Sequence, residues 1–320
     1  MSPRLVQLSG VILDLIYRVE ALPLPGQEAL VRGFSISAGG GFNAMVAARR
    51  MGLPVGFGGT TGTGPFADIV RRALKAQGIP ILRPRLAGHD QGVCVVLVEP
   101  AGERSFVASE GADGMVGDAD LAGLPLRRDD WLLLSGYALG YAGSRDALTH
   151  WLGAQGRKRR LVFDPAPLVA HLAPEALKAA LGAALWVTAN GAEATTLTSL
   201  ADPARAAEAL AKGRTGGGAV VRVGADGCWL ALPDQPALHL PGHPARPVDT
   251  NGAGDAHIGA FIALLAKGQT PANAARIANV AAAISTETEG PATAPTLATV
   301  LAAMGETLPA NDKPSTRRTP

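Results

Sequence analysis

A short glycine-rich run that leads into a helical pattern carries the clearest chemical signal in this chain. Residues 249–255 read Asp-Thr-Asn-Gly-Ala-Gly-Asp. The apolar residues that follow are spaced as in a helix with one buried face: Ile258, Phe261, Ile262 and Leu265. Free N–H groups and the positive dipole end at the start of such a helix favour an anion, and small residues let it approach the backbone. We therefore predict an anion-binding loop at the Gly-Ala-Gly run.

Asp255 stands at this predicted anion site, where its charge would repel a bound phosphate. A carboxylate in this place is suited to act as a base that deprotonates a hydroxyl group as it attacks a phosphoryl group. The other interpretation is structural, with Asp255 capping the helix while the glycines turn the chain. The run alone leaves both interpretations open.

The composition indicates an α/β protein and gives little reason to expect a nucleic-acid or membrane partner. The 320 residues are 47% hydrophobic, include 40 Gly and 24 Pro, and carry a formal net charge of +2. No apolar run reaches the ~20 residues of a membrane span, and no N-terminal export signal is visible. Cys94 and Cys228 stand singly, which is typical of reduced core residues. We expect a cytoplasmic protein that binds neither nucleic acid nor membranes.

The order of strand-like and helix-like segments predicts a mostly parallel sheet. The first hundred residues are strand-like and rich in turns, with a hairpin at 93–108. From about residue 120 apolar strands alternate with helices, which is typical of a parallel sheet covered on both faces. Ligands collect at the carboxyl ends of such strands. Asp164, Asn190, Gly224 and the 249–255 loop should all lie there.

Two motifs near these strand ends could bind a nucleotide. Asn190-x-x-Glu193 follows a strand and offers oxygen ligands for a hydrated Mg²⁺, although the same pair is also a common helix cap. The glycine-rich turn from Arg222 to Gly227 could lie along nucleotide phosphates or ribose, or it could be a plain hairpin turn. Both pairs of interpretations stay open.

Two further features could bind other parts of a ligand. The run Ala38-Gly-Gly-Gly-Phe-Asn43 opens a short helix, and together with Asp14 it suits a polyhydroxylated ligand. Asn279 lies in the alanine-rich second helix after the 249–255 loop. It could face a bound base, or it could be a buried Asn bonded to backbone.

Taken together, these motifs resemble the ribokinase-like (PfkB) family of carbohydrate kinases. The resemblance runs from about residue 5 to residue 303, and Asp249–Asp255 is similar to the highly specific C-terminal signature of that family. Gly39–Gly52 is similar to its N-terminal signature, and residues 101–106 and 110–112 to its lid hairpin. The resemblance implies a mostly parallel central sheet flanked by helices, with a small β-sheet lid. We therefore expect one kinase domain over 1–308, a lid from roughly 11–20, 29–37 and 92–108, and a disordered tail over 309–320.

The resemblance also implies a role for each matching residue. Asp255 would be the base, and the amides of Gly252, Ala253 and Gly254 would hold the charge that grows on the transferred phosphoryl group. The residues that match substrate-hydroxyl contacts are Asp14, Gly39, Gly40 and Asn43, and those that match ATP contacts are Asn190, Gly224, Asp226, Gly227, Gly254 and Asn279. Asn190 and Glu193 would orient Mg²⁺ through water. The residues that match a monovalent-cation site, here for K⁺, are Asp249, Asn251 through its carbonyl, Ser285 and Gly290.

The implied reaction is the transfer of the ATP γ-phosphate to a hydroxyl, preferably a primary one, of a small sugar. Three departures from the family pattern bear on the acceptor: Ala38, Gly64 and Gly136. Gly136 stands where ribokinases place an acidic sugar contact, which argues against ribose. A nucleoside kinase of the same fold is the alternative, with Phe42, Phe106 and Tyr137 as candidate walls for a base. A homodimer through the lid is a further expectation, since many relatives pair in this way.

Overall fold

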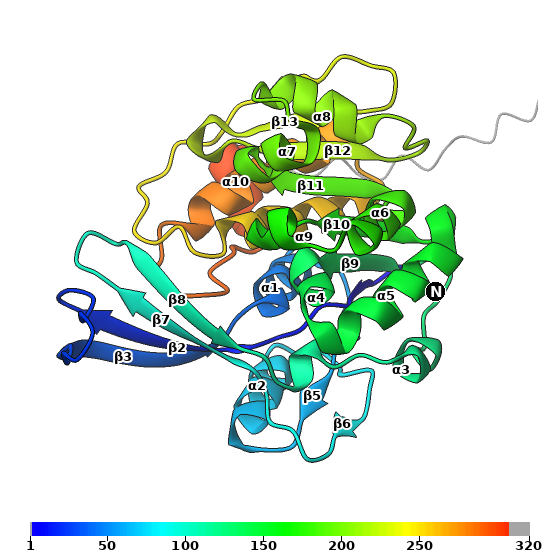
Figure 1. The fold of residues 1–320 in the computed structure, drawn as a ribbon. Helices are drawn as coiled ribbons and strands as arrows, with labels where there is room; N and C mark the ends of the chain where they lie inside the picture. The colour runs from blue at the N-terminus through cyan, green and yellow to red at the C-terminus, as the bar shows by residue number, and fades with distance from the viewer. Residues whose placement is uncertain (1, 307–320) are drawn as a thin grey trace, which may run out of the picture.

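A central eight-stranded sheet organises the chain. The computed structural model describes residues 2–306, and the sheet has the order β14-β13-β12-β11-β10-β9-β1-β4 (Figure 1). The strands from β4 to β12 are parallel, and β13 and β14 add an antiparallel edge. Their bounds are β1 Leu5–Gln7, β4 Val55–Phe57, β9 Trp131–Ser135, β10 Arg160–Asp164, β11 Trp186–Asn190, β12 Gly218–Arg222, β13 Cys228–Ala231 and β14 Leu238–Leu240. The predicted mostly parallel sheet is confirmed.

Helices cover both faces of this sheet and bury one apolar core on each (Figure 1). One face carries α1 Gly41–Arg50, α2 Pro65–Ala76, α9 Ala253–Ala266, α10 Pro271–Ser285 and α11 Leu297–Met304. The other carries α3 Asp118–Ala122, α4 Gly136–Gly140, α5 Ala142–Gln155, α6 Pro174–Ala183, α7 Gly191–Thr198 and α8 Pro203–Ala211. Because both faces are covered, the central strands are apolar without alternation, as Leu132–Leu134 shows.

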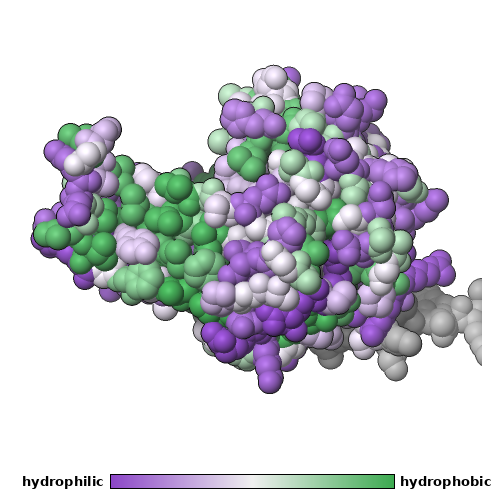
Figure 2. Space-filling view, turned by 60° about the horizontal axis from the view of Figure 1, so that its bottom comes forward, coloured by the Kyte–Doolittle hydropathy of each residue, from purple (hydrophilic) through white to green (hydrophobic). Residues whose placement is uncertain are grey.

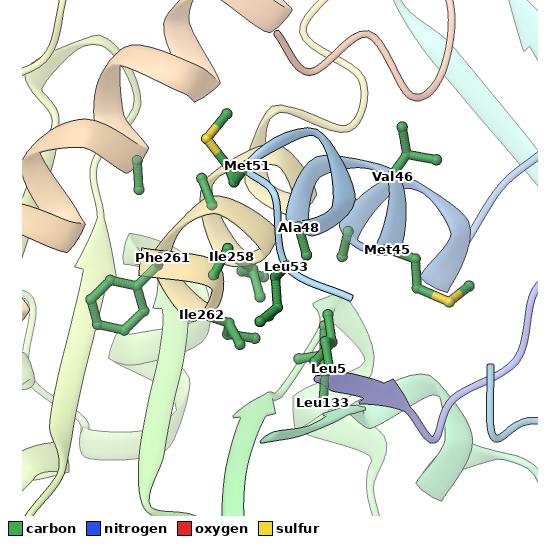
Figure 3. Close-up of a cluster of buried hydrophobic side chains, with 14 of the residues drawn as sticks. Leu5, Met45, Val46, Ala48, Met51, Leu53, Leu133, Ile258, Phe261 and Ile262 are labelled. Carbon is green, nitrogen blue, oxygen red and sulfur yellow. The ribbon is translucent and has the colours of Figure 1, made fainter. Parts of the chain in front are cut away.

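Helices α1 and α9 pack closely against each other over the sheet. Their apolar side chains meet above Leu5 and Leu133, with Ala48 on α1 on the side of Ile258 and Ile262 of α9, whereas Met45 lies farther along α1 (Figure 3). At Gly259 the contact is so close that an added Cβ would lie 2.3 Å from the Ala44 carbonyl oxygen. The glycine therefore sets the distance between the two helices that begin at the candidate site.

A separate four-stranded sheet projects from the body (Figure 1). Its order is β3-β2-β7-β8, with β2 at Leu13–Val19, β3 at Val31–Ala38, β7 at Val93–Val98 and β8 at Arg104–Ser109. The β7–β8 hairpin matches the hairpin predicted from the sequence. A third, two-stranded sheet is formed by β5 Thr61–Gly62 and β6 Arg85–Leu86. We call the four-stranded sheet the lid.

The helix and strand bounds follow the sequence pattern closely, and each difference has a local cause. The short helix expected to open at the Ala38–Asn43 run begins at Gly41, because Gly40 is its N-cap with φ +60°. Short helices at α3 and α4 were not expected, since five residues are too few for a periodic pattern. The lid bounds and the extent of one kinase domain stay predictions, and the expected tail at 309–320 lies outside the described residues.

Candidate active site

Asp255 lies in the first turn of α9, where the chain turns from loop to helix. Gly252 is the N-cap residue, with φ +76°, and no side chain caps this helix end. The interpretation of Asp255 as the capping residue is therefore wrong. Its carboxylate instead accepts a hydrogen bond of 3.2 Å from the amide of Asn43, which lies 212 residues earlier on α1. The amide oxygen of Asn43 in turn accepts from the Ala292 N–H at 3.0 Å, so the pair is held from both sides.

The surroundings of Asp255 keep its carboxyl protonated up to near-neutral pH. Burial, followed by the negative charge of Asp164, raises the pKa of Asp255 to about 7. The Asn43 hydrogen bond and the Arg222 charge act in the opposite direction and are smaller. A carboxyl with this pKa can both take up and release a proton near neutral pH.

Arg222 joins three strand ends on one side of Asp255. It ends β12, and its guanidinium donates to the Thr188 hydroxyl at 2.5 Å and to the Asp164 carboxylate at 3.4 Å. The Glu193 carboxylate lies 3.8 Å from the same guanidinium. Burial raises the pKa of Asp164 and of Glu193, and Arg222 counteracts this rise. One arginine thus faces two carboxylates at the carboxyl edge of the sheet.

Asn190 and Glu193 form a reciprocal cap at the start of α7. The Asn190 side chain accepts from the Glu193 N–H at 2.8 Å, and the Glu193 carboxylate accepts from the Asn190 N–H at 2.8 Å. The helix-cap interpretation therefore describes the observed contacts. Glu193 is buried, and Asn190, its partner in the cap, lines the adjoining cavity. A role toward Mg²⁺ stays a prediction.

A cavity of about 460 Å³ adjoins the start of α9. Its lining includes Asn190, Arg222, Gly224, Gly254, His257 and Asn279, so it brings together residues from four predicted motifs. Gly227 lines it as well, whereas Asp226 does not. A larger hollow of about 620 Å³ beside α2 contains none of these residues. The smaller cavity is the one associated with the candidate chemistry.

Asp14 and the start of α1 lie on the lid side of Asp255. The Asp14 carboxylate fills the space at Gly39, where an added Cβ would lie 2.1 Å from a carboxylate oxygen. Burial raises the pKa of Asp14 to about 6, and the charge of Asp14 helps to raise the pKa of Asp255. Gly40 has φ +60° and turns the chain into α1, which carries Asn43. The predicted acceptor-binding residues are thus brought together.

Comparison with known proteins decides the family. The family described as pfkB family carbohydrate kinase matches residues 3–297. This chain belongs to the PfkB family of carbohydrate kinases. It is therefore a kinase, a phosphotransferase with an alcohol group as acceptor.

The relatives of this PfkB kinase include sugar kinases from bacteria and archaea. It is 30% identical over 280 residues to the uncharacterized sugar kinase YegV of Escherichia coli (strain K12), covering 85% of each chain. It is 29% identical to an ATP-dependent ribose-1-phosphate kinase of Halopiger xanaduensis, covering 95% of this chain and 98% of that one. Arabidopsis thaliana ribokinase complexed with ribose and ATP shares the fold, with a TM-score of 0.79, 20% identity and coverage of 96% and 100%. The predicted ribokinase-like fold with its separate small sheet is confirmed.

On the nucleotide side of the PfkB kinase, Asn279 is buried and bonded to backbone. Its amide donates to the carbonyl oxygens of Leu240 and Pro241 at 2.9 and 3.1 Å, and its oxygen lies 3.1 Å from His257 Nε2. Because that amide oxygen can only accept, His257 donates from Nε2. Burial lowers the pKa of His257 to about 3, so the ring is neutral. Asn279 also lines the cavity, so a contact with a base stays a prediction.

The residues predicted for a monovalent cation also meet in the kinase. Asp249 accepts from the Asn251 N–H at 2.8 Å and the Gly290 N–H at 3.1 Å, and it pairs with Arg104 of the lid. Burial raises the pKa of Asp249, but these N–H donors and the Arg104 charge outweigh burial and lower it overall. The Ser285 side chain donates to the Ala282 carbonyl at 2.7 Å. All four predicted residues lie around the loop that precedes α9.

The structure adds residues to which sequence reasoning assigned no role. Arg222, Thr188 and His257 contribute to the nucleotide side, and Arg104 reaches Asp249 from the lid. Arg222 ends β12 in register with Asn190 at the end of β11, so its place at the carboxyl edge was the available signal. Among residues 2–306, no three or more His, Cys, Asp or Glu side chains are grouped as ligands for a metal ion. None of the described helices has the length and apolar character required to span a bilayer.

At Gly136 and Gly64, two of the departures from the family pattern, a neighbouring residue occupies the space that a side chain would need. An added Cβ at Gly136 would lie 1.9 Å from the Pro165 carbonyl oxygen, so no side chain fits there. At Gly64 the Asp90 carboxylate occupies the space and accepts from the Phe66 and Ala67 N–H groups at 3.2 and 2.7 Å. Asp90 thus caps α2.

Proposed function

We propose that this kinase transfers the γ-phosphate of ATP to a hydroxyl group of an uncharged sugar. The observation that carries the proposal is the place of Asp255. Its carboxyl, with a pKa of about 7, lies at the start of α9 between the Asp14 and Asn43 side and the Arg222 side. A base in this position can serve both an incoming hydroxyl and a terminal phosphate.

Asp255 acts as the base in an in-line transfer. The acceptor oxygen forms a bond to the γ-phosphorus while the bond from that phosphorus to the bridging oxygen breaks, and ADP leaves with the electron pair. The hydroxyl proton passes to the Asp255 carboxylate, which Asn43 orients. The backbone N–H groups of Gly252, Ala253 and Gly254 stabilise the charge on the transferred group, since no side chain caps this helix end; the Ala253 N–H would exchange its long 3.3 Å bond to the Thr250 carbonyl for the phosphoryl oxygen.

Residues at the carboxyl edge of the sheet fit a nucleotide with its magnesium ion. The site contains three carboxyl groups, those of Asp164, Glu193 and Asp255. Only one arginine, Arg222, lies close enough to offset their charge, so the site has an excess of carboxylates. Mg²⁺ would neutralise phosphate charge when bound, and it keeps several of its waters. Asn190 and Glu193 would hold it through those waters. Arg222 would contact phosphate oxygens, and Gly224, Gly227 and Asn279 would border the nucleotide in the cavity.

The charges around the acceptor favour a neutral sugar. Asp14 lies against Gly39 and Asp255 is bonded to Asn43, so both carboxyl groups lie at the start of α1, and the charge of Asp14 contributes to the raised pKa of Asp255. Arg104 is paired with Asp249, and Arg222 lies on the nucleotide side, where it is proposed for the phosphates of ATP. A phosphate or carboxylate on the acceptor would meet like charge without a free cationic partner. The acceptor of this kinase therefore differs in charge from ribose 1-phosphate.

A nucleoside is the second candidate acceptor. Phe106 on the lid is 60% exposed and Tyr137 on α4 is 44% exposed, so both offer an apolar ring to a ligand. Such rings could pack against a flat base. Phe42, the third candidate, is buried in the core and is not available in this way.

We further propose a cytoplasmic homodimer that pairs through the lid. The two cysteines, Cys94 and Cys228, are free and buried, in keeping with a reducing compartment where ATP is available. One lid face is apolar and exposed, with Phe34, Ile36 and Val107 at 53%, 43% and 64% exposure (Figure 2). A second copy would cover this face.

The test is an ADP-release screen with wild type and Asp255→Asn on identical substrates. The panel contains neutral pentoses and hexoses, their phosphates, sugar acids and nucleosides. We expect turnover with a neutral sugar and none above background in the variant. Turnover restricted to phosphorylated or acidic acceptors would overturn the neutral-acceptor proposal, and turnover restricted to nucleosides would favour the second candidate.

A further inference from the structure

We infer that Arg104 of the lid performs the electrostatic role that a monovalent cation would have beside the phosphate-binding loop, so that this kinase works without K⁺. Arg104 is then a positioning residue, because it acts on the loop that carries the anion-binding amides. The inference rests on the kinase activity and concerns the link between lid and loop.

The loop before α9 is held by a small set of contacts around Asp249. Asp249 lies three residues before the N-cap Gly252, and its carboxylate accepts from the N–H groups of Asn251 and Gly290 at 2.8 and 3.1 Å. The Thr286 carbonyl oxygen accepts from the N–H groups of Val248 and Asp249 at 2.7 and 3.0 Å. Asp249 therefore fixes the direction in which the chain enters Gly252–Gly254.

The negative charge of Asp249 is buried and needs a positive partner. Its side chain is only 9% exposed, and the Arg104 side chain that pairs with it is 22% exposed. A buried carboxylate without such a partner is costly. Since the guanidinium is in contact with the carboxylate, the charge is already compensated from within the chain.

The residues predicted for a monovalent cation do not fit one in this arrangement. The Asp249 carboxylate has three N–H partners, one of them the Arg104 guanidinium. The Ser285 carbonyl oxygen accepts from the Thr293 hydroxyl at 2.7 Å, so this acceptor is also engaged. A cation at Asp249 would meet the positive charge of Arg104.

The same contact couples the lid to the chemistry. Arg104 begins β8, which pairs along its length with β7, so a displacement of the lid moves the guanidinium relative to Asp249. A second ion pair, between Arg18 on β2 and Glu289, also joins the lid to the body; Glu289 precedes Gly290, but the pair makes no contact with the Asp249 carboxylate itself. Arg18→Ala therefore removes a different ion pair between lid and body, and it serves as the control for Arg104→Ala.

The test compares wild type with Arg104→Ala, Arg104→Lys and Arg18→Ala, each in KCl and in tetramethylammonium chloride at equal ionic strength. We expect wild type and Arg18→Ala to show the same kcat and Tm in both salts. Arg104→Ala should lose about 10- to 100-fold in kcat because the loop is misplaced. K⁺ should restore part of this loss and raise the Tm of the variant by about 2–4 °C. Arg104→Lys should keep most of the activity and remain insensitive to K⁺.

The Tm readout needs no substrate, so it tests the inference even if the acceptor proposed above is wrong. A wild-type enzyme that K⁺ activates or stabilises would overturn the inference. An Arg104→Ala variant whose Tm and kcat do not respond to K⁺ would overturn it as well. A variant that only raises the KM for the sugar would instead make Arg104 an acceptor contact.

Discussion

Asp255 has a pKa that places its titration in the range where the kinase must work. Burial and the charge of Asp164 raise that pKa to about 7, and only the carboxylate form can accept the hydroxyl proton. We expect kcat to rise with pH through this region. Asp255→Asn should lower kcat by about 10²–10⁴-fold while ATP binding, measured by calorimetry, is retained. Near-normal turnover in the variant would remove Asp255 from the role of base.

The same pKa predicts a pH-dependent cost in stability. The folded protein keeps a proton on Asp255 up to about pH 7, whereas the unfolded chain releases it near its ordinary value of 3.8. The free energy of unfolding therefore falls as pH rises between these values. Asp255→Asn should melt at a higher temperature than wild type at pH 8, and the difference should shrink toward pH 4. Parallel melting curves across this range would contradict the shift.

Substitution of Arg222 should lower the catalytic efficiency of the kinase strongly. Its guanidinium is held by Thr188 and Asp164 in the cavity wall, aimed at the place proposed for phosphate. Removing it in Arg222→Met should lower kcat/KM by about 10²–10³-fold, the size expected for a transition-state donor. Arg222→Lys should recover only part, because an ammonium group lacks the forked geometry.

Arg214→Met is the control for Arg222, since Arg214 is also buried but bonds only to backbone carbonyls of Leu210, Leu181 and Ala184. It should lower the Tm and leave the kcat of folded enzyme close to wild type. Equal effects of the two substitutions on kcat would show that Arg222 acts through folding alone.

Among the elements, the α1–α9 pair predicts a sharp effect at Gly259. An alanine Cβ there would lie 2.3 Å from the Ala44 carbonyl oxygen, so the helices must separate. Gly259→Ala should cost about 1–3 kcal/mol of stability and also lower kcat, because Asp255 lies one turn earlier on the same helix. Gly153→Ala on α5 has open space and should slightly raise the Tm. An unchanged Tm in Gly259→Ala would contradict the close packing.

The sequence predicts elements well where the signal is local. The Gly-Ala-Gly run at the start of α9 and the strand before Asn190 are both defined by neighbouring residues, and both features are present in the structure. The contacts that complete the site join distant segments. Asn43 and Asp255 are 212 residues apart, and Arg104 and Asp249 are 145 apart. Such pairs depend on how whole helices and strands pack together, and no short sequence pattern specifies that packing.

At the scale of the whole molecule, the lid predicts the oligomeric state. Strand register places Ile36 and Val107 on one lid face, in the row that contains Leu15 and Val95, whereas Phe106 lies on the opposite face. Val107→Glu should therefore weaken a homodimer by inserting charge into its interface. Phe106→Glu, the neighbouring control, should not. Sedimentation velocity measures both, and a wild-type monomer at micromolar concentration would contradict the dimer.

The order of the site residues along the chain has a consequence for how such kinases diversify. Asp14, Gly39 and Asn43 come from the first strands and helix, whereas Asn190, Gly224 and Asn279 come from the second half. With the roles proposed for these residues, acceptor choice and donor use would be encoded by separate stretches of the gene. Mutations, or exchange of an N-terminal gene fragment between relatives, can alter which sugar is accepted and leave the phosphate donor machinery intact.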